Sequence, residues 1–168
     1  MSTAETVQPW LVSRDTRRLL DFIAEAFGGE ELARIPTEDG AIGHAEIRVG
    51  ASTLLAFDSR PDWPETFGML RVFVDDADAA VERARAAGAR IVTEVADAAW
   101  GDRGGRVRDP LGNIWWVVHH VEDVPPAEMA ARLREPRYQQ AMAAAQSTLD
   151  AELGTAGTGW SSPPVLDG

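Results

Sequence analysis

Residues 100–116 read WGDRGGRVRDPLGNIWW. Within this stretch, the Asp-Pro-Leu-Gly run at 109–112 predicts a tight reversal, because proline fixes one backbone dihedral and glycine tolerates a positive φ. The Asp109 carboxylate can accept hydrogen bonds from the backbone amides of such a turn. Strand-forming residues flank the turn at 105–108 and 113–119. The stretch therefore predicts a β-hairpin.

The charged residues of this hairpin have two possible roles, as catalytic ion pairs or as salt bridges of the surface and the turn. They are Asp102, Arg103, Arg106, Arg108 and Asp109. Salt bridges of the second kind are common in proteins of every function. We therefore favour the structural interpretation for this group.

The chain contains two copies of one pattern of predicted strands and a helix, and the hairpin belongs to the second copy. The second copy predicts strands at 69–74, 90–94, 105–108 and 113–119, and the first predicts strands at 7–13, 30–35, 44–49 and 53–57. A helix follows the first strand of each copy, started by Asp15 or by Asp75-Asp76 and stopped by Gly28 or Gly88. Both the starts and the stops are separated by 60 residues, which indicates an internal duplication.

These patterns predict an α+β fold of two tandem strand–helix–three-strand modules, at about 7–58 and 68–121, within one domain of residues 1–124. Modules joined by a linker at 58–67 could pair within one chain or exchange between two chains. A C-terminal extension at 125–153 carries an alanine-rich helix from about 127 to 151. We predict a flexible tail at 154–168, and we favour a tail residue over a surface anchor for Trp160.

Composition excludes several classes of function. A formal charge of −11 disfavours nucleic-acid binding, and no apolar run reaches the roughly 18 residues of a membrane span. The chain has no cysteine and its basic residues are all arginine, which removes thiolate nucleophiles, zinc on cysteine and Schiff-base lysines. The N-terminus does not read as a secretion signal, so we expect a cytoplasmic protein.

Residues 100–116, together with 9–15, 26–28, 44–50 and 121–124, are similar to the PhnB-like, glyoxalase-like branch of the vicinal oxygen chelate (glyoxalase/bleomycin-resistance) superfamily. The resemblance spans residues 7 to 135. It implies that the two modules form a glyoxalase-like open barrel of mixed sheet. It also implies a homodimer, with clefts near the subunit interface.

The resemblance further implies four metal-ligand positions, two in each module. In this chain they are occupied by Gln8, Leu55, Gly68 and Trp116. Only Gln8 has a donor atom, and a divalent cation needs several converging donors. We therefore predict that the usual metal site is absent and that the protein holds no cofactor.

A relocated metal site is the alternative. His44 and Glu46 lie two residues apart on one predicted strand, so they face the same side. His119 lies three residues beyond Trp116, and the adjacent His120 must point in the opposite direction. Such a site would use His44, Glu46 and His119 to hold a divalent metal.

Counting alternate residues predicts which side chains share the concave face of the joined sheets. They are Gln8, Trp10, Val12, Thr53, Leu55, Phe57, Leu70, Val72, Ile114, Trp116 and Val118. Such a face would form an apolar, aromatic-lined pocket of the kind that binds small molecules. The same residues could instead simply fill the core.

Three functions remain in consideration. The first is a metal-independent protein that binds a hydrophobic or aromatic small molecule, as bleomycin-resistance-type relatives sequester drugs. Its ligand-binding residues would be Gln8, Trp10, Leu55, Phe57, Leu70, Trp116 and His119. The second is a metal-dependent lyase, isomerase or dioxygenase with relocated ligands. The third is an interaction protein whose C-terminal helix docks onto another chain; no catalytic residue is assigned in any of the three.

Overall fold

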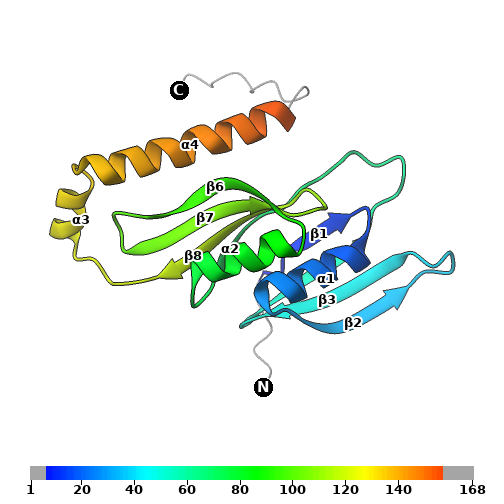
Figure 1. The fold of residues 1–168 in the computed structure, drawn as a ribbon. Helices are drawn as coiled ribbons and strands as arrows, with labels where there is room; N and C mark the ends of the chain where they lie inside the picture. The colour runs from blue at the N-terminus through cyan, green and yellow to red at the C-terminus, as the bar shows by residue number, and fades with distance from the viewer. Residues whose placement is uncertain (1–6, 157–168) are drawn as a thin grey trace, which may run out of the picture.

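The computed structural model describes residues 7–156, which form two four-stranded mixed sheets and four helices (Figure 1). The first sheet has the order β1-β4-β3-β2 and consists of β1 (Trp10–Ser13), β2 (Glu30–Pro36), β3 (Ile42–Val49) and β4 (Ser52–Asp58). The second has the order β5-β8-β7-β6 and consists of β5 (Met69–Phe73), β6 (Arg90–Asp97), β7 (Asp102–Arg108) and β8 (Ile114–His120). The helices are α1 (Thr16–Phe27), α2 (Ala77–Ala86), α3 (Pro126–Arg132) and α4 (Pro136–Ala156).

The predicted α+β fold is confirmed, and each sheet repeats the same connectivity around one parallel strand pair. β1 pairs with β4 in parallel and β5 pairs with β8 in parallel, whereas the other neighbours are antiparallel. The two sheets stay separate and do not close into a barrel. None of the described helices is long and apolar enough to cross a membrane.

The boundaries of α1 follow the predicted capping residues, whereas α2 differs at both ends, since its C-cap is Ala87, one residue before the predicted Gly88. The Asp15 side chain accepts a hydrogen bond from Arg18 N at 3.0 Å, and Gly28 ends α1 with a φ of 68°. In α2, however, the cap is Asp76, whose side chain accepts from Ala79 N at 2.9 Å. The alignment of Asp15 with Asp75 is therefore wrong by one residue, because the backbone enters α2 one position later.

The hydrophobic core lies between the helix layer and the two sheets. It combines side chains of α1 and α2 with one face of each sheet, so a single core serves both halves of the chain. Trp115 of β8 is 1% exposed and its ring lies 4.9 Å from that of Phe27 and 6.3 Å from that of Phe22. The α1 phenylalanines therefore tie the first half of the chain to the second sheet.

The Asp-Pro-Leu-Gly turn forms the predicted hairpin between β7 and β8. The Asp109 carboxylate accepts from the backbone of Leu111 and Asn113 at 2.8 and 3.0 Å, and from the Trp115 indole at 2.9 Å. Asp109 is 4% exposed, and Gly112 has a φ of 99°. The structural interpretation of Asp109 is therefore correct.

The C-terminal segment differs from the single helix predicted at 127–151. It forms α3 and then α4, which starts at Pro136, because proline lacks the backbone N–H that a helix interior requires. α4 continues to Ala156, so residues 154–156 are helical and do not belong to the predicted tail. The rest of that tail, with Trp160, lies outside the described residues.

α4 packs on the second sheet of its own chain, on the face opposite α2 (Figure 1). Arg106 Nη1 donates to the backbone oxygen of Ala145 at 2.8 Å, and the hydroxyls of Thr93 and Thr148 lie 2.7 Å apart. Near its C-terminus, Glu152 accepts from Arg90 at 2.7 and 2.8 Å. Within the chain, α4 therefore covers the second sheet, and the predicted docking of this helix onto another chain stays a prediction.

Candidate functional site

The open face of the second sheet carries a row of three side chains from adjacent strands. Strand register places Arg71 of β5 and Arg106 of β7 on either side of Trp116 of β8. The guanidinium carbons of Arg71 and Arg106 lie 4.6 and 5.1 Å from the centre of the Trp116 ring. Both distances are typical of cation–π contacts. The indole of Trp116 is therefore held between two cationic groups.

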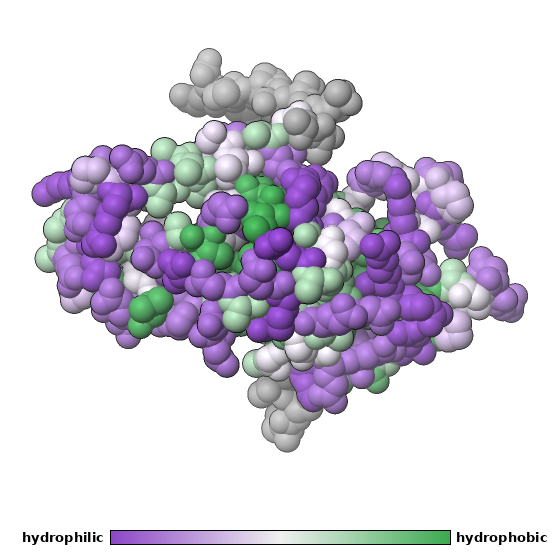
Figure 2. Space-filling view, viewed as in Figure 1, coloured by the Kyte–Doolittle hydropathy of each residue, from purple (hydrophilic) through white to green (hydrophobic). Residues whose placement is uncertain are grey.

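A cavity of about 430 Å³ lies between this face and α4. Its walls on the sheet side include Trp100, Trp116 and Val118, and its walls on α4 include Ala141, Met142 and Ala145. The alanine side chains of α4 are too small to fill this space. The surface in Figure 2 is mostly hydrophilic, with apolar residues visible below α4. The cavity is the candidate site, since tryptophan and aliphatic walls with a few polar groups are typical of small-molecule pockets.

Asp102 organises one end of the cavity. Its carboxylate accepts from Arg71 Nη2 at 2.5 Å, from the Trp100 indole at 2.9 Å and from His120 Nδ1 at 2.9 Å. The hydrogen bond to Asp102, with a second to Asp123, raises the pKa of His120. Asp102 is 7% exposed, so these donors compensate the burial of its charge. The contact also fixes the orientation of the Trp100 ring in the wall.

Arg106 is half-buried and differs from the other arginines of the sheet. Its Nη1 donates to two neutral oxygens, Ala145 O at 2.8 Å and Thr93 Oγ1 at 3.3 Å. Burial lowers the pKa of Arg106, because removing a guanidinium from water disfavours its charged form. No carboxylate of residues 7–156 forms an ion pair with it.

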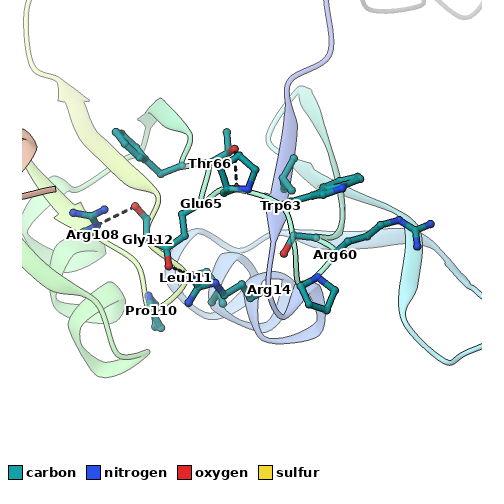
Figure 3. A pocket seen from close by; sticks show the side chains of 14 residues that line it. Arg14, Arg60, Trp63, Glu65, Thr66, Arg108, Pro110, Leu111 and Gly112 are labelled. Atoms are coloured by element: carbon teal, nitrogen blue, oxygen red, sulfur yellow. Dashed lines mark hydrogen bonds and ion pairs between the residues drawn. The ribbon is translucent and has the colours of Figure 1, made fainter. Parts of the chain in front are cut away.

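A second cavity, of about 540 Å³, lies where the 59–67 linker faces the β7–β8 turn (Figure 3). Arg14, Arg60, Trp63 and Glu65 line it, and Arg14 forms an ion pair with Glu65. Both members of this pair are more than 70% exposed. Water screens such exposed charges, so this linker cavity is a weaker candidate than the one under α4.

Most of the predicted ligand-binding residues lie away from the α4 cavity. Trp10 and Phe57 share the open face of the first sheet, as predicted, with ring centres 5.3 Å apart. Gln8 is exposed ahead of β1, and Leu55 is 6% exposed. Of the seven candidates, only Trp116 lines the cavity.

The predicted face is wrong for Leu70 and Val72. In the parallel register of β5 with β8, Leu70 pairs with Trp115 and Val72 pairs with Val117, so both face the helices and not the side of Trp116. Apolar residues occupy both faces of β5, and alternation alone therefore cannot tell which face meets the helices. His119, three residues after Trp116, also points to the opposite face, and His120 takes the position beside Asp102.

The residues at the expected metal positions do not fit a metal ion. Trp116 lies between two guanidinium groups, which would repel a cation. Gly68 has no side chain, and its N–H donates to Asn113 Oδ1 at 2.8 Å. Leu55 has no donor atom. The four positions therefore offer the Gln8 amide as their single side-chain donor.

The relocated metal set is also not assembled. His44 Nε2 and Glu46 Oε1 lie 3.0 Å apart on β3, which confirms that they face the same side. His119, however, belongs to the other sheet. Within residues 7–156, no three histidine or acidic side chains are grouped to hold a metal ion.

Sequence reasoning missed Trp100, Asp102 and Arg106 as residues of the cavity. All three belong to the 100–116 stretch, where Asp102 and Arg106 were interpreted as surface or turn residues and Trp100 was given no role. Their role depends on α4, which covers them from a distant part of the sequence. A signal was nevertheless present, because Arg106 and Trp116 flank the turn at positions that pair across a hairpin.

Comparison with known proteins places these observations in a family. The model of the Glyoxalase/Bleomycin resistance protein/Dioxygenase superfamily matches residues 5–117. An uncharacterized protein of Mycobacterium tuberculosis (strain H37Rv) is 35% identical over 138 residues, covering 76% of this chain and 81% of the relative. An uncharacterized protein of Mycobacterium bovis is also 35% identical over 138 residues and is covered to 91%.

Solved structures share the fold over about 70% of the chain. TioX from Micromonospora sp. ML1 is 29% identical, with a TM-score of 0.59, over 70% of this chain and 100% of TioX. A glyoxalase/bleomycin resistance protein/dioxygenase family enzyme from Burkholderia phytofirmans PsJN has a TM-score of 0.58 at 18% identity, over 70% of this chain and all of that enzyme. The family model ends before α3 and α4, so the helical wall of the cavity lies beyond the matched region.

Proposed function

The chain belongs to the glyoxalase/bleomycin resistance protein/dioxygenase superfamily, and on that premise we propose that it binds an aromatic small molecule without a metal. The observation that carries the proposal is the cavity of about 430 Å³ between α4 and the second sheet. Its volume falls within the roughly 300–1,000 Å³ of small-molecule pockets.

The shape and chemistry of the walls favour a flat, aromatic ligand. Trp100 and Trp116 offer large apolar rings, and their indoles present area at low conformational cost. Met142 on the facing helix has an unbranched side chain that adapts to ligands of different outline. A planar ring system could therefore be held between the sheet and α4.

The mode of binding follows from the absence of a metal-ligating side chain at position 116. Trp116 stands at a position where metal-dependent relatives are expected to carry a ligand, and its neighbours are cationic. Affinity would thus come from ring contacts and burial of apolar surface, and not from coordination. The reaction chemistry of metal-dependent relatives is not part of this proposal.

A ligand screen on the chelator-treated full chain tests the proposal. The probes are indole, quinoline, 2-naphthamide and 2-naphthoate, and binding is followed by ligand-observed NMR. We expect at least one two-ring probe to bind, and Trp116→Leu to weaken it about tenfold or more through loss of ring contact and buried area.

Trp63→Leu is the matched control, because Trp63 lines the linker cavity and not the α4 cavity. It should leave the affinity unchanged. Failure of every probe to bind, or loss of binding in Trp63→Leu with none in Trp116→Leu, would contradict the proposed site.

A further inference from the structure

We infer that the ligand of the α4 cavity is an aromatic acid and that Arg106 is the counter-ion of its anionic group. This inference rests on the proposed function, since it needs an aromatic molecule in the cavity. It adds the charge of that molecule and the residue that selects it.

The charges around the cavity leave one cation without an anionic partner among the described residues. Asp102 is paired with Arg71, and Asp97 is paired with Arg103 at 2.9 Å. Glu94 also lines the cavity but is exposed. Arg106 is the cation that remains, and it donates to the neutral oxygens of Ala145 and Thr93.

A half-buried guanidinium of this kind favours an anionic ligand. Burying a charge is unfavourable unless an opposite charge or several hydrogen bonds compensate it. A guanidinium has five N–H donors in a planar fork, and the two bonds of Arg106 to protein both start from Nη1. The remaining donors suit a carboxylate, which accepts two parallel hydrogen bonds from such a fork.

The position of Arg106 fits an acid attached to a ring. Arg106 pairs with Trp116 across β7 and β8, and it also contacts α4 through Ala145. A ring lying against Trp116 can therefore place a substituent at Arg106. Arg71, on the other side of Trp116, is already bound to Asp102, so its charge is compensated within the protein.

The test compares two probes that differ in charge and little in shape, 2-naphthoate and 2-naphthamide, by calorimetric titration of the full chain at neutral pH. We expect the wild-type protein to bind the acid at least about tenfold more tightly than the amide, as a charge-assisted hydrogen-bonded pair would provide. Arg106→Met should abolish this preference, and Arg106→Lys should retain part of it.

The controls separate the two proposals. Arg85→Met removes an exposed arginine of α2 that pairs with Glu82, and it should keep the full preference for the acid. Because Arg106 also anchors α4, circular dichroism and melting temperature are measured for each variant. If Arg106→Met does not fold, the acid-to-amide ratio of the wild-type protein still tests the anionic ligand, and the ratio of Arg106→Lys tests the role of Arg106.

Each result has a distinct meaning. Equal affinity of the wild-type protein for acid and amide would overturn the anionic ligand and leave the aromatic site standing. A preference for the acid that persists in folded Arg106→Met would overturn the role of Arg106. Binding of neither probe would contradict the proposed function, and the inference would fall with it.

Discussion

Trp115 and Trp116 are neighbours in the chain with opposite environments. Trp115 is 1% exposed, packs on the α1 phenylalanines and donates its indole N–H to Asp109. Trp116 faces the cavity between two arginines. Strand alternation separates the two rings, so one residue contributes to stability and the next can contact a ligand.

Asp109→Ala tests whether the contacts of Asp109 with Trp115 and the turn stabilise the fold. The buried carboxylate accepts from two backbone amides, from Asn113 Nδ2 and from the Trp115 indole, so its removal leaves several donors unsatisfied. We expect a loss of about 3 kcal/mol in the free energy of unfolding, measured by urea denaturation. Asp109→Asn, which keeps one acceptor oxygen, should lose less. A change within about 0.5 kcal/mol for the alanine variant would show that the turn does not depend on this residue.

At the scale of elements, polar contacts attach the C-terminal half of α4 to the second sheet. Glu152 is 8% exposed and is bound by Arg90 and Arg108. Hydrogen bonds from Arg90, and then from Arg108, lower the pKa of Glu152 to about 2 from its ordinary 4.5. The stability from this charge is therefore present above pH 4.5 and is lost as the pH falls toward 2.

Glu152→Gln should lower the free energy of unfolding by roughly 2 kcal/mol at pH 7, a figure that allows for solvent at the exposed Arg90. The difference from the wild-type protein should narrow as the pH falls from 5 toward 3, because the wild-type carboxylate then becomes protonated. Urea unfolding at several pH values measures this difference. Glu82→Gln, at an exposed ion pair of α2, is the control and should change stability little. If the difference in the free energy of unfolding between Glu152→Gln and the wild-type protein stays constant from pH 7 to 3, the ion pairs of Glu152 are not its cause.

The elements also differ in how well their patterns predict them. The hairpin, the Asp15 cap and the Gly28 stop are local, because each depends on residues within a few positions. The orientation of β5 is not a local property, because apolar residues lie on both of its sides and the choice of face depends on pairing with β8. Pro136, where α4 starts, is a local signal for a new helix. The alanine-rich sequence on both sides of it nevertheless led to the prediction of one continuous helix.

For the whole molecule, the repeated pattern and the resemblance together anticipated the fold, and strand alternation anticipated two residues of the cavity wall, Trp116 and Val118. Trp116 was predicted from its strand position. The cavity itself requires α4 to lie across the second sheet, and contacts between residues so far apart in sequence leave no periodic pattern to read. The predicted homodimer stays a prediction, and the exposed Trp10 and Ile35 on the first sheet are where a partner's contact could be sought.

The central claim is that the space between α4 and the second sheet binds an aromatic ligand, and filling that space tests it most directly. Calorimetric titration of 2-naphthoate is compared between Ala141→Phe, whose new ring enters the cavity, and Ala143→Phe, at an exposed position of the same helix. We predict that Ala141→Phe loses binding while remaining folded, and that Ala143→Phe binds like the wild-type protein. Unchanged affinity in a folded Ala141→Phe variant would contradict the claim and move the site elsewhere on the molecule.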